Sequence, residues 1–176
     1  MQATRDGMIA LLPRLRAFAR SLARSPDAAD DLVQATCERA LRSIGAFEAG
    51  TRLDSWMFRI MRNLWIDTYR KAANEAPADT WIGDTAGEDG RRTTEANLML
   101  ASVRAAIMRL PEEQRSVLVL VCVEEMSYRE AVDILDIPMG TVMSRLARAR
   151  AALITTMEGA DVRAIPISLQ NGGRRQ

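Results

Sequence analysis

The side chains best suited to chemistry in this sequence are arginines, aromatic residues and carboxylates that recur at helical spacing. One stretch places Trp56, Phe58, Trp65 and Tyr69 among arginines, with Asn63 between them. Aromatic rings stack on unpaired bases, arginine contacts backbone phosphates, and an amide offers a donor and an acceptor to a base edge. This stretch could therefore bind a single nucleic-acid strand. The open alternative is that Trp56 and Trp65 only pack against neighbouring helices.

A second arginine-bearing pattern predicts two short helices joined by a tight turn. Ser127–Glu130 is a capping box that opens the first helix, which breaks at Asp136–Pro138 before a longer helix begins. The outward positions of that longer helix are Thr141, Ser144, Arg145 and Arg148, whereas Val142, Leu146, Ala149 and Leu153 point inward. This arrangement is typical of a helix-turn-helix, whose second helix enters the major groove. Helical hairpins also occur in proteins that do not bind DNA, so that alternative stays open.

A third pattern is an acidic and amide face on an earlier helix. Ser25-Pro26-Asp27 predicts the helix start, with serine as N-cap, proline in the first turn and an acid at the positive end of the dipole. The polar face comprises Asp27, Asp30, Asp31, Gln34 and Glu38, and the core face comprises Leu32, Val33, Cys37, Ala40, Leu41 and Ile44. Such a face is either simply solvated or a docking surface for a basic partner.

Several classes of function find no support in the sequence. Histidine is absent, which removes the commonest general base and a leading zinc ligand. Asp30 and Asp31 are adjacent on a helix and do not face one another. We therefore expect no enzyme activity, no catalytic residues, no metal and no cofactor. Cys37 and Cys122 are expected to be buried thiols in a reducing compartment. The absence of a signal peptide or a membrane-spanning run predicts a cytoplasmic protein without membrane insertion.

The elements that must position these residues are helices in two blocks. Of the 176 residues, 48% are hydrophobic and only 5% are aromatic, which favours an all-α fold. We predict two small helical domains, residues 8–73 and 95–158, joined by a flexible acidic linker, 74–94, and followed by a disordered tail, 159–176. The net charge of +1 conceals an uneven distribution: residues 1–71 carry 12 basic and 8 acidic side chains, and residues 72–102 carry 2 and 6.

In this order, the two blocks resemble an extracytoplasmic-function sigma factor of the sigma-70 family. The motifs of the first block are Asp30–Gln34, then Phe47, then Ser55–Asn63. Those of the second are Leu110–Arg115, Ser127–Glu130 and Ile137–Arg150. No third domain fits between the blocks, as this class requires. A weaker similarity in the opening block, Leu15–Ala19, is to the general-stress subgroup of alphaproteobacteria.

The resemblance implies a protein that binds core RNA polymerase and directs promoter recognition and DNA melting, in a stress response and under an anti-sigma factor. Docking on the polymerase, at the β′ clamp helices and β flap, would involve Asp30, Asp31, Gln34 and Glu38 on the clamp side. Capture of a base from the −10 strand would involve loop 48–53 with Phe47, Phe58 and Asn63. The other −10 contacts would be Trp56 and, on backbone phosphates, Arg59, Arg62 and Arg70. Reading of the −35 element would involve Thr141, Met143, Ser144, Arg145 and Arg148.

This sequence departs from the family pattern in the −35 block. Met143 stands where the family usually has lysine or arginine, and Asp136 replaces the commonest turn glycine. The rival interpretation is a conventional helix-turn-helix regulator that binds a palindromic site without polymerase. The acidic docking face and the aromatic helix around Trp56 argue against that rival.

Overall fold

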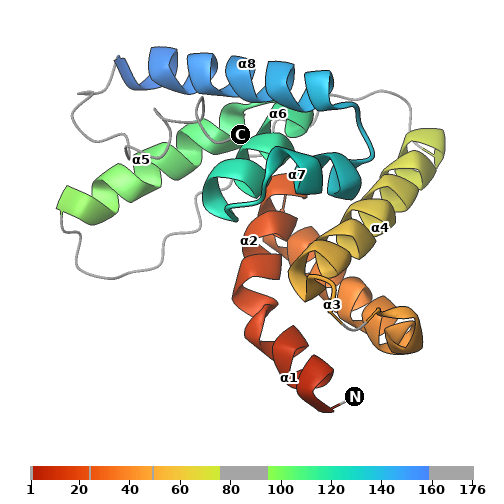
Figure 1. Cartoon of the computed structure of the whole chain (residues 1–176). Coiled ribbons are helices and arrows are strands. Elements are labelled where there is room, and N and C mark those ends of the chain that lie inside the picture. The colour runs from red at the N-terminus through yellow and green to blue at the C-terminus, as the bar shows by residue number, and fades with distance from the viewer. Residues whose placement is uncertain (1, 24, 49, 76–94, 159–176) are drawn as a thin grey trace. The chain divides into compact units, whose positions relative to one another are not determined.

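The computed structural model describes residues 2–23, 25–48, 50–75 and 95–158. The described residues are mainly helical and contain no strand, which confirms the predicted all-α class (Figure 1). The elements are α1 (Gln2–Ala10), α2 (Leu12–Leu22), α3 (Pro26–Arg42), the 3₁₀ turn η1 (Ile44–Ala46), α4 (Leu53–Glu75), α5 (Glu95–Arg109), α6 (Glu112–Leu118), the π-helical turn η2 (Val119–Val123), α7 (Tyr128–Leu135) and α8 (Met139–Glu158). No described helix is long and apolar enough to cross a membrane.

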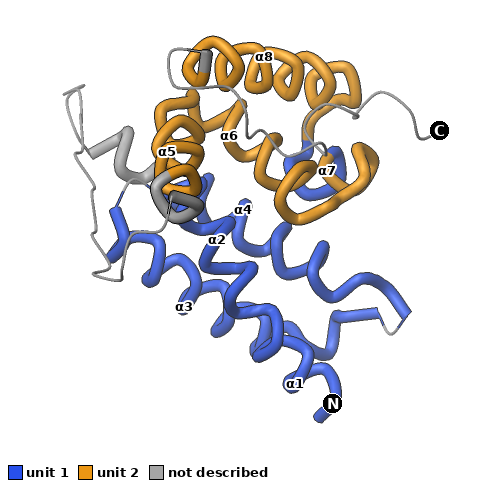
Figure 2. The backbone as a smooth tube through the Cα atoms, turned by 90° about the vertical axis from the view of Figure 1, so that its left-hand side faces the viewer, with its two compact units in different colours: residues 1–86, 132–136 blue, residues 87–131, 137–176 orange. Residues whose placement is uncertain are grey.

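The chain divides into two compact units (Figure 2). The first comprises residues 1–86 with 132–136, and the second comprises residues 87–131 with 137–176. Helix α4 runs to Glu75, two residues beyond the predicted end of the first domain. The rest of the predicted linker, and the predicted disordered tail, lie outside the described residues.

The core of the first unit lies between α2, α3 and α4. Phe18 of α2 and Phe58 of α4 are both fully buried, and their rings meet edge to face with centroids 5.1 Å apart. Such a pair contributes about 0.5–1.5 kcal/mol beyond the burial of its surface. The other fully buried large side chains of these helices are Leu15, Leu22, Met57 and Met61. The buried face of α4 is therefore set by residues 57, 58 and 61.

The start of α3 follows the predicted local rules. The Ser25 side chain accepts a hydrogen bond from the backbone N–H of Ala28 at 3.2 Å, with Pro26 and Asp27 in the first turn. Leu32, Val33 and Ala40 are buried as expected. The expectation that Leu41 joins the core is wrong, because its side chain is 47% exposed.

A buried carboxylate joins α2 to the start of α4. Asp54 is 8% exposed and accepts hydrogen bonds from Arg14 of α2 at 3.0 Å and from Arg52 at 2.7 and 3.1 Å. The Arg14 guanidinium also lies over the Phe58 ring, 5.6 Å from its centroid. In the loop before α4, the Thr51 hydroxyl donates to the carbonyl of Glu48 at 2.7 Å.

These partners change the acidity of Asp54. Burial alone would raise the pKa of the carboxyl, but the hydrogen bonds from Arg52, from Arg14 and from the backbone N–H of Ser55 outweigh it and lower the pKa to about 2. The ionised carboxylate is thus the form that the fold stabilises.

The core of the second unit lies between α6 and α8. Val117, Leu118 and Leu120 are buried, as are Val142, Leu146, Ala149 and Leu153 of α8, which confirms the predicted inward positions. Arg115 is only 5% exposed, and its guanidinium donates to the carbonyls of Met108 and Leu110 at 2.9 and 3.1 Å. It therefore satisfies carbonyl groups at the end of α5 that would otherwise lack partners.

The predicted capping box and turn are present around α7. The backbone N–H of Ser127 donates to the Glu130 carboxylate at 2.7 Å, and the backbone N–H of Glu130 donates to the Ser127 hydroxyl at 3.2 Å. Asp136, directly after α7, has a φ of +51°, in the left-handed region. A non-glycine residue is uncommon there, although aspartate tolerates it better than most.

The Asp54 cluster predicts an acid-sensitive fold. Because the folded-state pKa lies near 2 and the unfolded value near 3.9, the stability that Asp54 contributes is present above pH 4 and is lost as the pH falls toward 2. Asp54→Asn should lower the free energy of unfolding at pH 7 by about 1–2 kcal/mol and flatten its pH dependence. Thermal melts between pH 7 and pH 2.5 test this. Asp67→Asn, an exposed carboxylate on the same helix, is the control and should retain the wild-type pH dependence.

The turn predicts a second stability effect. Asp136→Val should lower the free energy of unfolding by about 1–2 kcal/mol, because a β-branched side chain is strained at positive φ. Asp136→Gly removes that strain and should melt at a higher temperature than Asp136→Val. Equal destabilisation by both variants in thermal melts would mean that the aspartate side chain, and not the backbone angle, is what matters.

Candidate nucleic-acid interfaces

The acidic face of α3 is open to solvent. Asp30, Asp31, Gln34 and Glu38 are all exposed. Gln34 donates to Glu38 at 3.2 Å, and Arg42 pairs with the other oxygen of Glu38 at 3.3 Å, so one end of the face is partly neutralised. The exposed Leu41 extends this face by one turn. The sequence pattern missed that apolar addition, since the spacing of Leu41 fits the core as well as the surface.

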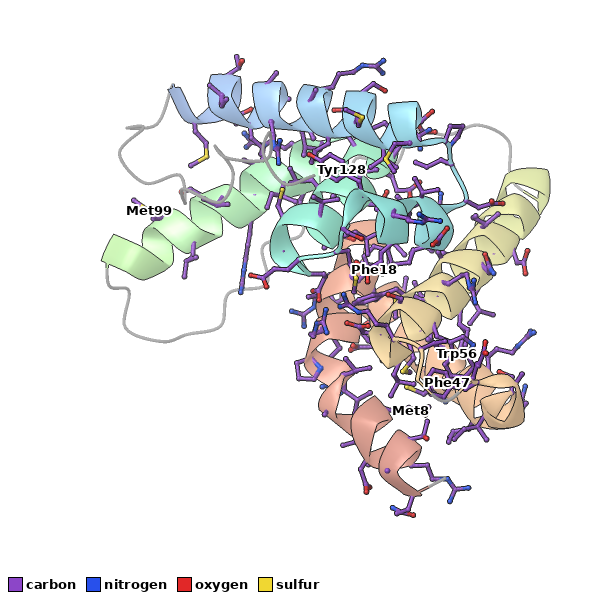
Figure 3. All side chains as sticks on the ribbon, viewed as in Figure 1. Met8, Phe18, Phe47, Trp56, Met99 and Tyr128 are labelled. Atoms are coloured by element: carbon purple, nitrogen blue, oxygen red, sulfur yellow. The ribbon has the colours of Figure 1, made fainter. Side chains whose placement is uncertain are left out.

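Two aromatic rings meet where the loop returns to α4. Phe47 and Trp56 are half-buried, with ring centroids 5.2 Å apart and planes inclined by 52° (Figure 3). Between them, Gly50 has a φ of +97°, which favours glycine, and the backbone N–H of Thr51 donates to the carbonyl of Glu48. Trp56 thus packs against a neighbouring ring and keeps part of its surface accessible. The ring contact agrees with a packing role for Trp56, and its contact with a nucleic-acid strand stays a prediction.

Helix α4 presents a polar face beside this aromatic pair. Arg59 and Asn63 are exposed and four residues apart, so they lie on one side of the helix. Arg62 is half-buried, and the side chain of Arg70 lies outside the described residues. The prediction that Phe58 contacts DNA is wrong, because its side chain is fully buried against Phe18. Phe58 supports the site from the core.

The loop before α4 is anchored by a cluster of charged side chains that the sequence pattern does not reveal. Arg52 is bound to Asp54, and Asp54 is bound in turn to Arg14 of α2. This cluster fixes the end of the loop relative to α2. Its sequence signal is an acid two residues after an arginine near a helix start, whereas Arg14 is 40 residues away.

On α8, the predicted DNA-facing side chains differ in exposure. Met143 is 53% exposed and Arg148 is exposed, whereas Thr141 and Ser144 are half-buried. The Ser144 hydroxyl donates to the carbonyl of Thr141 at 3.2 Å. The prediction that Arg145 points outward is wrong, because its side chain is 20% exposed and pairs with Glu113 of α6 at 2.8 Å.

No group of three or more histidine, cysteine or acidic residues is arranged to hold a metal ion within the part of the chain that the structure describes. The two cysteines are free and half-buried. Burial raises the pKa of the Cys37 thiol, although the nearby Arg16 acts to lower it. The thiol is therefore protonated at neutral pH. What the described surfaces offer is recognition: an acidic face on α3, an aromatic and amide face on α4, and an exposed face on α8.

Family models match both units of the chain. Residues 8–75 match sigma-70 region 2, and residues 100–153 match sigma-70 region 4. The chain is 43% identical over 150 residues to the ECF RNA polymerase sigma factor EcfG of Rhodopseudomonas palustris (strain TIE-1), covering 85% of this chain and 82% of that protein. It is 33% identical over 136 residues to the ECF RNA polymerase sigma factor SigW of Bacillus subtilis (strain 168), covering 71% and 73%.

Solved structures give the same result. The sigma factor RpoE in complex with the anti-sigma factor NepR from Bartonella quintana is similar with a TM-score of 0.75 and 29% identity, over 92% of this chain and 100% of that one. CnrH in complex with the cytosolic domain of CnrY is similar with a TM-score of 0.64 and 28% identity, over 91% and 90%. Matching regions in the predicted order, over most of the length of these relatives, show that this chain belongs to the extracytoplasmic-function sigma factors, a family of transcription initiation factors of RNA polymerase.

Proposed function

We propose that this sigma factor divides promoter recognition between its helices: α3 docks on the polymerase, α4 captures the −10 strand and α8 reads the −35 element. The observation that carries the proposal is the exposed face of α4, where Arg59 and Asn63 lie beside the Phe47–Trp56 pair. A ring that stacks and an amide that pairs with a base edge are what an unpaired base requires. RNA synthesis belongs to the polymerase, so this chain needs no catalytic centre and no cofactor.

Docking on the polymerase would use the acidic face of α3. Asp30, Asp31, Gln34 and Glu38 are exposed on consecutive turns of one helix, a geometry that suits the basic surface of another helical pair. We assign the β′ clamp helices of the core enzyme as that partner, with the β flap as the partner of the second unit. Both assignments place the protein in the cytoplasm, where the polymerase acts.

The −10 and −35 contacts differ in kind. On α4, Asn63 would read the flipped base, while Arg59 and Arg62 would hold phosphates, which position the strand without specifying sequence. On α8, Arg148 is the exposed cation, Thr141 and Ser144 lie on the same side of the helix, and Met143 is exposed on a neighbouring side. Arg145 would join them only after releasing Glu113, an ion pair whose breakage costs about 1 kcal/mol or less because Glu113 is largely exposed.

Control by an anti-sigma factor is part of the proposal. Two structurally similar proteins were solved in complex with other proteins, RpoE with the anti-sigma factor NepR and CnrH with the cytosolic domain of CnrY. A comparable protein that covers the α3 and α8 faces would keep this chain from polymerase and promoter until a stress signal releases it.

The first functional prediction is a requirement for the polymerase. The isolated chain should bind promoter duplex weakly, because each reading face is small and the net charge is only +1. Core polymerase should add sequence-specific binding. Electrophoretic mobility shifts with the chain alone, the core alone and both together test this. Tight, specific binding by the chain alone would favour a conventional helix-turn-helix regulator instead.

The second functional prediction separates the two DNA sites. Asn63→Ala should weaken promoter opening, because it removes about 1–3 kcal/mol of discrimination between bases at one −10 position. The loss should be smaller on templates that are already melted. Arg148→Ala should weaken −35 engagement equally on duplex and melted templates. The measurement is run-off transcription on both templates.

Arg104→Ala is the matched control, since Arg104 is an exposed arginine of α5 outside the proposed interface. It should transcribe like the wild type. If Asn63→Ala and Arg148→Ala show the same template dependence, the proposed division between α4 and α8 is wrong.

A further inference from the structure

The exposed face of α8 carries an apolar stripe. Met139 is 41% exposed and Met143 is 53% exposed, and Ala147 is exposed one turn further along. Residues four apart lie one above another on a helix, so these three side chains form a continuous strip on one side of α8. Val142 and Leu146, three residues after Met139 and Met143, are buried in the core, so the stripe runs along the edge of the core face. The stripe is therefore not part of the hydrophobic core of the unit.

The arginines of α8 do little to offset this apolar character. Arg145 is held by Glu113 and is 20% exposed. Arg150 is half-buried, and its guanidinium donates to the sulfur of Cys122 at 3.7 Å. Of the three arginines in this helix, Arg148 alone is exposed. A recognition helix with this surface has few charged donors with which to read guanine.

The major groove offers one base edge that suits an apolar side chain. Adenine, guanine and cytosine present polar groups there, whereas thymine also presents its C5-methyl group. Methionine is unbranched and polarisable, so it can adapt its shape around a methyl group. Burying exposed methionine against such a group removes apolar surface of both partners from water.

We infer that Met139 and Met143 are specificity-determining residues that read thymine methyl groups in the −35 element, on either strand. This inference rests on the proposed function, since it requires α8 to lie in the major groove. At position 143, where the family usually has arginine or lysine, methionine would make a contact that depends on the shape of the thymine methyl group and not on charge. The −35 preference of this chain should accordingly depend on thymine methyl groups, with Arg148 fixing the register on the backbone.

The test removes single methyl groups from the DNA. A promoter selected by the complete holoenzyme from a genomic library is rebuilt with uracil in place of each thymine of the −35 element, on each strand in turn. Uracil keeps every hydrogen-bonding group of thymine and lacks only the methyl group. Holoenzyme affinity should fall on the order of fourfold at one or two positions, the effect of burying about one methylene.

Variants assign the effect to the helix face. Met143→Ala and Met139→Ala should each abolish the thymine-over-uracil difference at one position, because the side chain that covers the methyl group is gone. Met99→Ala, an exposed methionine of α5, is the matched control and should keep the full difference. Met143→Arg should lose the methyl dependence and gain salt dependence equivalent to about one phosphate contact.

Two results would overturn the inference in distinguishable ways. If the wild type binds thymine and uracil promoters equally while Arg148→Ala still weakens −35 binding, α8 lies in the groove and the methionines do not read methyl groups. If Arg148→Ala also has no effect, the placement of α8 in the groove fails as well. A thymine preference that survives both methionine variants would assign methyl reading to other residues.

Discussion

The burial of Phe58 against Phe18 determines how α4 is rotated, and that rotation determines which side chains of the first unit can meet DNA. With Phe58, Met57 and Met61 turned into the core, Arg59 and Asn63 are left on the outer side. The same ring lies beneath the Arg14 guanidinium, which bonds Asp54 one turn earlier on the helix. Core packing and the anchoring of the loop thus depend on each other, because Phe58 and Asp54 both lie in the first two turns of α4 and both contact Arg14.

An analogous constraint acts in the second unit. Val142, Leu146, Ala149 and Leu153 commit one side of α8 to the core, so Met139 and Met143 lie along one edge of that side and Arg148 lies on the side away from it. Arg145 lies at the boundary between these sides. There its guanidinium is close enough to α6 to pair with Glu113, which explains why a residue at an outward-looking spacing is mostly covered.

Local features of the sequence predicted the elements well, because their causes are local. The Ser25 cap and the Ser127–Glu130 box each depend on residues within three positions, and both form as expected. The inward side of α8 followed from its apolar period. What the pattern could not decide depends on distant partners: Phe58 is buried because Phe18 lies opposite, 40 residues earlier, and Arg145 is covered because of Glu113. The exposure of Leu41 belongs to the same class, since spacing alone did not separate the edge of the core from the surface.

The arginines show why composition alone was a poor guide to DNA binding. Arg14 and Arg52 stabilise a carboxylate, Arg115 binds the carbonyls that end α5, and Arg145 and Arg150 contact protein groups. Their guanidinium groups are thus engaged within the fold, and the net charge of the chain is only +1. Non-specific attraction to DNA grows with the number of phosphates neutralised, so it should be weak for this chain. Weak attraction suits a protein that must find promoters as a subunit of polymerase: specificity then arises when two modest reading faces act on one DNA molecule, since their binding free energies add once the polymerase holds both in place.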